Sequence, residues 1–120
     1  MKIETRIIDR VLVLDAHGRL VLGEDCQNLR SVVDNLLDSG MTNILLNLGD
    51  VGMIDSSGLG AMLSCKQKTE AADGTFKLLN LTARHRKLLV MTYLITHFEH
   101  FEDEGEATAS FNIPVAQAIK

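Results

Sequence analysis

The chain has 120 residues, close to the commonest size of a single domain, and 46% of them are hydrophobic, enough for one core. Its 12 basic and 16 acidic residues give a formal charge of −4, and it offers one tyrosine, four phenylalanines and no tryptophan for stacking on bases. We therefore expect one domain over residues 1–120 and no nucleic-acid partner.

Two strands are predicted at the start of the chain. Residues 2–7 alternate between polar and apolar side chains, a period of two that is typical of a half-exposed edge strand. Residues 11–14 are all apolar and predict a second, more buried strand. Asp9 and Arg10 separate them, but a two-residue type I′ turn needs positive φ at both positions, which these residues disfavour. The pattern therefore predicts a hairpin without fixing its turn type.

Helical and strand patterns alternate through the rest of the chain. Apolar residues recur at helical spacing from Leu29 to Leu37, and Gly40 lies where a left-handed C-terminal cap belongs. Further strands are predicted over 43–48, 76–81 and 97–102, and further helices over 57–72, 83–91 and 104–111, with Pro114 blocking continuation of the last. This order predicts an α/β domain with a mixed sheet of four to five strands and helices packed mainly on one face.

The cysteines and the hydropathy pattern bear on the compartment. Cys26 and Cys65 are isolated, belong to no CxxC arrangement, and each falls within a predicted helix, which is typical of free thiols in a reducing compartment. No apolar run approaches membrane-spanning length, and the first residues carry no signal-peptide pattern. We therefore expect a cytoplasmic protein that does not insert into a membrane.

The stretch D-V-G-M-I-D-S-S-G-L-G-A-M-L, residues 50–63, places two serines between a predicted strand and a predicted helix. A nucleophile elbow would read G-x-S-x-G, but Ile54 occupies the place of its first glycine. A dinucleotide fingerprint starting at Gly58 would need a glycine where Leu63 stands. The four histidines form no recognisable triad signature, and His97 and His100 on one strand would point to opposite faces. We expect no enzyme activity, no cofactor and no metal.

An aspartyl-phosphate receiver-like domain is an alternative of the same size, because Asp50 follows an apolar strand. Such a domain is expected to carry an acidic pair after its first buried strand and a lysine after a later strand. Here Asp15 is a single acid, and Lys77 lies near the start of its strand. We therefore rank this alternative low.

The serine motif could also have a purely structural role, at the start of the helix that follows it. Asp55, Ser56 or Ser57 could each act as its N-cap, a contribution of about 1 kcal/mol. Gly58 and Gly60 could simply admit close backbone packing. However, a cap does not need two glycines in the first helical turn, where each costs roughly 0.5–1 kcal/mol relative to alanine. They leave the turn bare, so that another protein's active site could approach a serine hydroxyl.

I-D-S-S-G-L-G-A-M-L resembles the phosphorylation loop and following helix of the STAS domain, a family named for sulfate transporters and anti-sigma factor antagonists. N-I-L-L-N-L-G-D-V is similar to the preceding strand, and G-R-L-V-L-G-E-D-C-Q-N-L-R-S-V-V to a glycine-containing loop and first helix. The resemblance implies an anti-sigma factor antagonist that binds an anti-sigma factor serine kinase and so releases a sigma factor. Phosphorylation of Ser56, next to Asp55, would end the binding, and Ser57 would be the neighbouring cap.

The resemblance also implies which residues contact the partner. They come from the glycine-containing loop and the serine motif: Gly18, Arg19, Leu20, Asp55, Ser56, Ser57, Gly58, Leu59 and Gly60. A serine phosphatase acting on phospho-Ser56 would restore the binding form, and the protein would be a monomer or weak dimer. A non-switching STAS subunit of a lipid-transport or large signalling assembly is the alternative, but the presence of both Asp55 and Ser56 favours the switch.

Two positions depart from the family pattern. The family commonly has an acidic or hydroxyl residue soon after the G-R-L loop, whereas Val21 and Leu22 follow here. Because this region meets the partner, the departure bears on partner identity. Tyr93 replaces a small residue, often glycine, between the third helix and the last strand, and this change bears on local packing.

Overall fold

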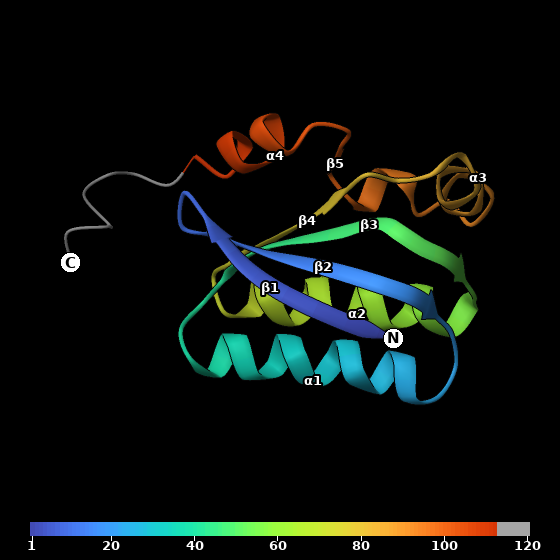
Figure 1. Ribbon diagram of the computed structural model, residues 1–120, viewed down its shortest axis with the longest axis horizontal. Coiled ribbons are helices and arrows are strands. Elements are labelled where there is room, and N and C mark those ends of the chain that lie inside the picture. Colours follow the sequence, from blue (N-terminus) through green and yellow to red (C-terminus); the bar gives the residue numbers. More distant parts are fainter. Residues whose placement is uncertain (113–120) are drawn as a thin grey trace.

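The computed structural model describes residues 1–112, which form one sheet and four α-helices. The strands are β1 (Lys2–Ile8), β2 (Val11–Leu20), β3 (Asn43–Ile54), β4 (Thr75–Leu79) and β5 (His100–Phe101). They lie in the order β1-β2-β3-β4-β5 (Figure 1). β1 is antiparallel to β2, and all other neighbours are parallel. The predicted mixed sheet is confirmed.

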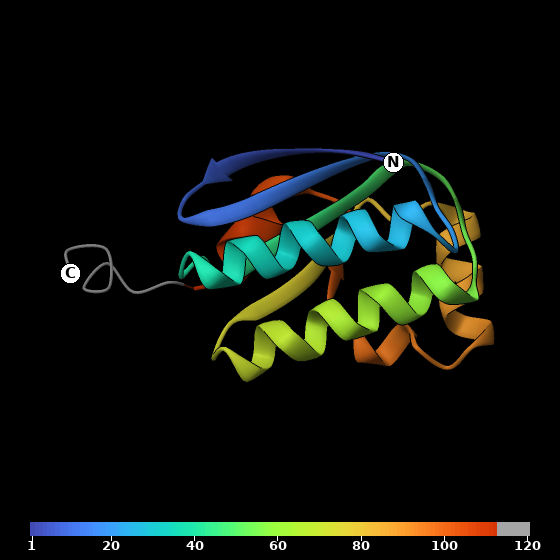
Figure 2. The ribbon, with the colours of Figure 1, turned by 90° about the horizontal axis from the view of Figure 1, so that it is seen from below.

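Two long helices cover one face of this sheet. α1 (Glu24–Asp38) and α2 (Ser56–Ala71) lie side by side there (Figure 1 and Figure 2), whereas the short α4 (Glu104–Ser110) lies on the opposite face. α3 (Ala83–Met91) and the 3₁₀ turn η1 (Ile95–His97) follow β4. The predicted α/β class with helices mainly on one face is confirmed. The expected stop at Pro114 lies outside the described residues.

The core has two parts because β2 is buried on both faces. Leu12 and Leu14 face α1 and α2 and join the larger cluster, which also contains Leu89 of α3. Val11 and Val13 point to the other face and pack with Ala107 of α4. The strand predicted from four consecutive apolar residues is therefore sandwiched between two layers of helices, as a continuous apolar run indicates.

β2 and β3 are longer than their apolar runs. β2 continues to Leu20 and β3 to Ile54, and these extensions of mixed polar and apolar residues pair with each other in parallel, with register shifts between Asp15 and His17 and between Gly18 and Arg19. The pairing of backbone groups does not depend on side-chain polarity, so the extension escaped the hydropathy pattern. In contrast, the strand predicted over 97–102 is mostly absent: β5 has two residues and follows η1.

The turn between β1 and β2 uses residues that disfavour it. Asp9 and Arg10 have φ of 49° and 69°, so both lie in the left-handed region that a type I′ turn requires. Seven antiparallel residue pairs between the two strands outweigh this local cost. Gly40, with φ of 82°, ends α1 as the predicted left-handed cap.

Candidate functional site

Asp55 organises the segment between β3 and α2. It is the N-cap of α2, and its Oδ1 accepts a hydrogen bond of 2.8 Å from the backbone nitrogen of Gly58. Its Oδ2 accepts a second, of 3.0 Å, from the backbone nitrogen of Leu22. The N–H groups of Leu22 and Gly58 hold the pKa of the Asp55 carboxyl below its ordinary value. One ionised carboxylate therefore joins the loop after β2 to the start of α2.

Ser56 and Ser57 occupy the first two helical positions and differ in exposure. The Ser56 residue is exposed, whereas Ser57 is half-buried. Within residues 1–112 neither hydroxyl makes a side-chain hydrogen bond. The prediction that Ser57 is a cap is wrong, because Asp55 stands at the N-cap and reaches the third helical N–H, while Ser57 is already inside the helix.

The two glycines of the motif serve different purposes. A Cβ atom at Gly58 would lie 2.2 Å from the carbonyl oxygen of Leu20, so this position needs glycine for α2 to approach β2. A Cβ atom at Gly60 would meet no atom within 4 Å, and the residue is exposed. Gly58 is therefore explained by close packing. Only Gly60 leaves the first turn of α2 bare and accessible.

The predicted partner residues divide between surface and core. Gly18, Arg19, Ser56 and Gly60 are exposed and lie on elements that meet around Asp55. The side chains of Leu20 and Leu59 are 0% and 4% exposed, and Gly58 is buried as well. The prediction that these three residues contact a partner directly is therefore corrected. Leu20 and Leu59 belong to the larger core cluster and stabilise the site by packing there.

A hollow beside the serines brings in residues that sequence patterns did not indicate. Ser57 and Gly60 of α2 line it together with Gln27 and Arg30 of α1, and its volume is about 300 Å³. Leu22, which departs from the family pattern, lies at the same hollow and is 77% exposed. The packing of α1 against α2 creates this contact, and no local signal in the sequence reports it.

Asp50 is paired rather than placed as a phosphate acceptor. Its Oδ2 lies 2.6 Å from Nδ1 of His17, and Nε2 of the same ring lies 3.0 Å from Oε1 of Glu4. The hydrogen bond to Asp50, and the negative charges of Asp50 and Glu4, raise the pKa of His17. Lys77 is engaged elsewhere, with Glu99 at 2.9 Å. The residues described thus give the receiver-like alternative no support.

His85 is a structural residue that the sequence did not single out. It is 2% exposed, and its Nδ1 accepts a hydrogen bond of 3.2 Å from the backbone N–H of Thr82, the N-cap of α3. Its Nε2 lies 2.7 Å from the carbonyl oxygen of Val51 and donates to it. Burial lowers the pKa of His85. The neutral ring therefore fastens α3 to the part of β3 that precedes Asp55.

The residues described also bear on a metal site, a membrane-spanning helix and reactive cysteines. Between residues 1 and 112, no cluster of three or more histidine, cysteine, aspartate or glutamate side chains is placed to hold a metal ion. No helix in this range is both long and apolar enough to cross a membrane. Cys26 in α1 and Cys65 in α2 are free and buried, and burial raises the pKa of the Cys65 thiol to about 12.

The fold and the Asp-Ser-Ser-Gly helix start define a known class of domain. The family model of the STAS domain matches residues 2–107, and the chain belongs to this family. A candidate anti-sigma factor antagonist of Thermotoga neapolitana is 29% identical over 102 residues, which cover 85% of this chain and 90% of that protein.

Solved structures show the same architecture. The crystal structure of a candidate anti-sigma factor antagonist from Thermotoga maritima matches with a TM-score of 0.85 and 25% identity, over 92% of this chain and 95% of that chain. The Bacillus cell fate determinant SpoIIAA, solved in its phosphorylated form, matches with a TM-score of 0.69 and 23% identity, over 91% and 98% of the two chains. The likeness to SpoIIAA concerns the fold alone.

Proposed function

We propose that this chain is an anti-sigma factor antagonist. Its unphosphorylated form binds an anti-sigma factor serine kinase and so releases a sigma factor, and phosphorylation of Ser56 ends the binding. The observation that carries this proposal is the exposure of Ser56 at the first position of α2, directly after the cap Asp55 and near the bare turn at Gly60. The names of the Thermotoga relatives support it.

Electrostatics explains how one phosphate would act as the switch. A phosphoserine adds about −1.5 to −2 charges, which the N–H groups and dipole at the start of α2 tolerate, so the fold persists. The surface changes instead, because the new charge lies beside the ionised carboxylate of Asp55. A partner surface complementary to a neutral hydroxyl would lose roughly 3 kcal/mol, a factor of about a hundred in affinity.

The chemistry of the switch belongs to the partners. The kinase supplies ATP and magnesium, and this chain contributes the acceptor hydroxyl without catalysis or a cofactor of its own. A serine phosphatase acting on phospho-Ser56 resets the binding form. These steps place the protein in the cytoplasm with the transcription machinery.

Phosphate mapping tests the proposal. The purified chain is incubated with ATP, magnesium and each anti-sigma factor serine kinase of its own genome, and fragment mass spectrometry locates the phosphate. We expect one phosphate on Ser56, none on the Ser56→Ala variant, and normal phosphorylation of the matched control Ser57→Ala. Ser56→Ala should still bind the kinase in calorimetry.

Two results would contradict the proposal. Phosphate on Ser57 would reverse the assignment of the serines. If no kinase modifies or binds the chain, and it purifies from its own cells with transport ATPase subunits, the non-switching alternative is correct.

A further inference from the structure

β1 is an open edge of the sheet. Within residues 1–112 it pairs only with β2, so its outer side carries backbone N–H and C=O groups without a strand partner (Figure 1). Five of its seven residues are exposed, and Ile3 and Ile8 are half-buried. An open strand of this length is a template for pairing with another strand.

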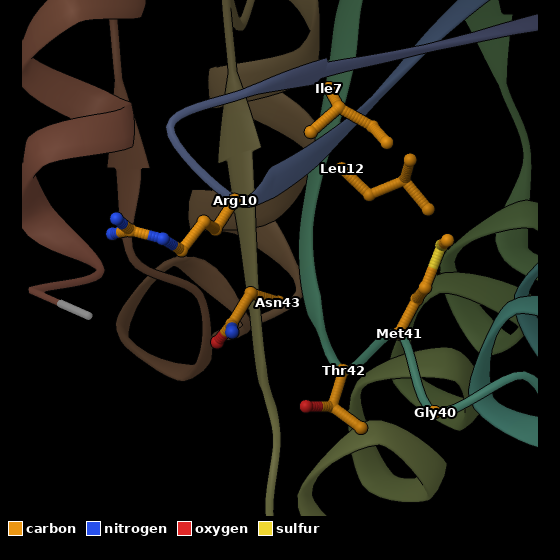
Figure 3. Close-up of a pocket in the computed structure, with 7 residues that line it drawn as sticks. All are labelled: Ile7, Arg10, Leu12, Gly40, Met41, Thr42 and Asn43. Atoms are coloured by element: carbon orange, nitrogen blue, oxygen red, sulfur yellow. The ribbon is translucent and has the colours of Figure 1, made fainter. Parts of the chain in front are cut away.

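An apolar hollow lies directly beside this edge. It measures about 250 Å³, and the side chains of Ile7 and Leu12 approach that of Met41 across it, whereas the Arg10 guanidinium points away (Figure 3). Ile7 is 63% exposed and Met41 is 42% exposed. A second hollow with the same three apolar residues continues towards Leu36 of α1. The edge is thus apolar on the side that faces the helices.

The strand is complementary to itself in one antiparallel register. Centred on Thr5, this register places Ile3 opposite Ile7 of a second copy, and Glu4 opposite Arg6 of that copy. It pairs the whole of β1 and keeps each side chain on its own face of the sheet. The symmetry makes each contact occur twice, so opposite charges meet at two places.

Neighbouring registers that also preserve the faces bring like charges together. Centring the pair on Glu4 would set Glu4 against itself and Lys2 against Arg6, and centring it on Arg6 would set two arginines opposite each other. Like charges directly opposite on adjacent strands are destabilising. The charge pattern of the strand therefore selects the register centred on Thr5.

We propose that two copies of this chain pair through β1 about a two-fold axis at Thr5, joining their sheets into one. Ile3 of the second copy then lies against Ile7 beside the hollow. Arg6 is already held by Asp15, at 2.5 Å, and by Glu104 of the same copy, so its position is fixed before pairing. Ser56 follows β3, two strands in from this edge, and stays accessible. The pairing is independent of the proposed phosphorylation.

A disulfide trap tests the register. In the register centred on Thr5, the two copies of position 5 lie opposite each other with their Cα atoms about 4.5–5.5 Å apart, a separation that a disulfide spans. Thr5→Cys should form a covalent dimer in a glutathione redox buffer. The native Cys26 and Cys65 are buried and should not compete for this disulfide. The matched control is Lys2→Cys, exposed on the same strand but opposite Ile8 of the second copy. Equal dimer yields from both variants, or no dimer from Thr5→Cys, would refute the register.

A charge swap tests the same contact without a covalent bond. Sedimentation from about 10 μM to 1 mM should show the mass of the wild-type chain rising from 13.2 kDa towards twice that value. Glu4→Arg and Arg6→Glu should each weaken dimerisation roughly tenfold, and the double variant should return to within about threefold of wild type. Recovery in the double variant reports the contact between copies, because the swap does not rebuild the bonds of Arg6 to Glu104 or of Glu4 to His17.

The control for this swap is Lys87→Glu, an exposed charge change on α3 that should leave dimerisation unchanged. Thermal melts of every variant confirm that it is folded. A wild-type chain that remains a monomer at about 1 mM, or a double variant as weak as the single ones, would overturn the proposal.

Discussion

The Oδ2 atom of Asp55 lies 3.0 Å from the backbone nitrogen of Leu22, across 33 positions of sequence. The same carboxylate caps α2 through Gly58. Asp55 is therefore a local helix cap and also a hydrogen-bonded link between the loop after β2 and α2, which begins with Ser56.

Removing this tie should lower stability more than a cap alone. We expect Asp55→Ala to lower the Tm by about 4–8 °C, because it removes an acceptor from two backbone N–H groups. Ser57→Ala is the matched control and should change the Tm by less than about 2 °C, since its hydroxyl caps nothing. Calorimetric melts measure both, and equal losses would contradict the assignment of the cap.

Gly58 and Gly60 should respond to alanine in opposite directions. Gly58→Ala forces a Cβ atom against the Leu20 carbonyl oxygen and should cost about 2–4 kcal/mol of unfolding free energy. Gly60→Ala meets open space inside a helix and should add about 0.5–1 kcal/mol. Urea denaturation of the two variants measures both changes in unfolding free energy. A Gly58→Ala variant more stable than wild type would contradict the close approach of Gly58 to the Leu20 carbonyl oxygen.

Stability should fall in mild acid because of His85. Burial lowers its pKa below the ordinary value of about 6.5, so the unfolded chain takes up the proton first. The stability that depends on neutral His85 is complete above about pH 6.5 and is lost as the pH falls towards the folded pKa. Urea midpoints measured between about pH 7 and pH 5 should therefore decrease.

Variants separate this effect from that of His17. His85→Leu should be less stable at every pH and show a smaller loss in acid. The pKa of His17 is raised, so its ion pairs stabilise the fold below its unfolded pKa and are lost as the pH rises through the folded pKa. His17→Gln should therefore steepen the loss in acid. An unchanged pH profile in His85→Leu would rule out His85 as the cause.

Tyr93 has a backbone conformation that favours glycine. Its φ is 60°, in the left-handed region, and its side chain is 85% exposed. Tyr93→Gly should relieve the backbone strain and raise the unfolding free energy by about 0.5–1 kcal/mol, less than the full cost of the left-handed form because glycine is freer when unfolded. Tyr93→Ala keeps the strain and should show no such gain in urea denaturation.

The order of elements and the class of the fold could be predicted from the chain because both depend on local periodicity. The helix over 83–91 has the predicted bounds, and Gly40 ends α1 as expected. The ends of β2 and β3, where polar and apolar residues are mixed, could not be found in this way, because only pairing between distant segments makes them strands. The hairpin between β1 and β2 was predicted, but its turn type could not be, because strand pairing overrides the preference of Asp9 and Arg10.

The sequence predicts a site around the serine motif, and the structure shows which of its residues are exposed and which are buried. Ser56 and Gly60 are exposed where a partner could reach them. The choice of Asp55 over Ser57 as the cap depends on where the helix begins, which patterns fix only to within a few residues. The burial of Leu20 and Leu59 depends on which side of each element faces the core, and the tie to Leu22 on tertiary packing.

The contact between Gly58 and the Leu20 carbonyl has a consequence for comparing relatives. Glycine is required at this position by packing and owes nothing to phosphate chemistry. A descendant that had abandoned the switch would be free to change the serine at position 56 while selection for folding kept the glycine two positions later. Gly58 thus reports the packing of α2 against β2, whereas under the proposed function Ser56 is the position whose loss would record a change of use.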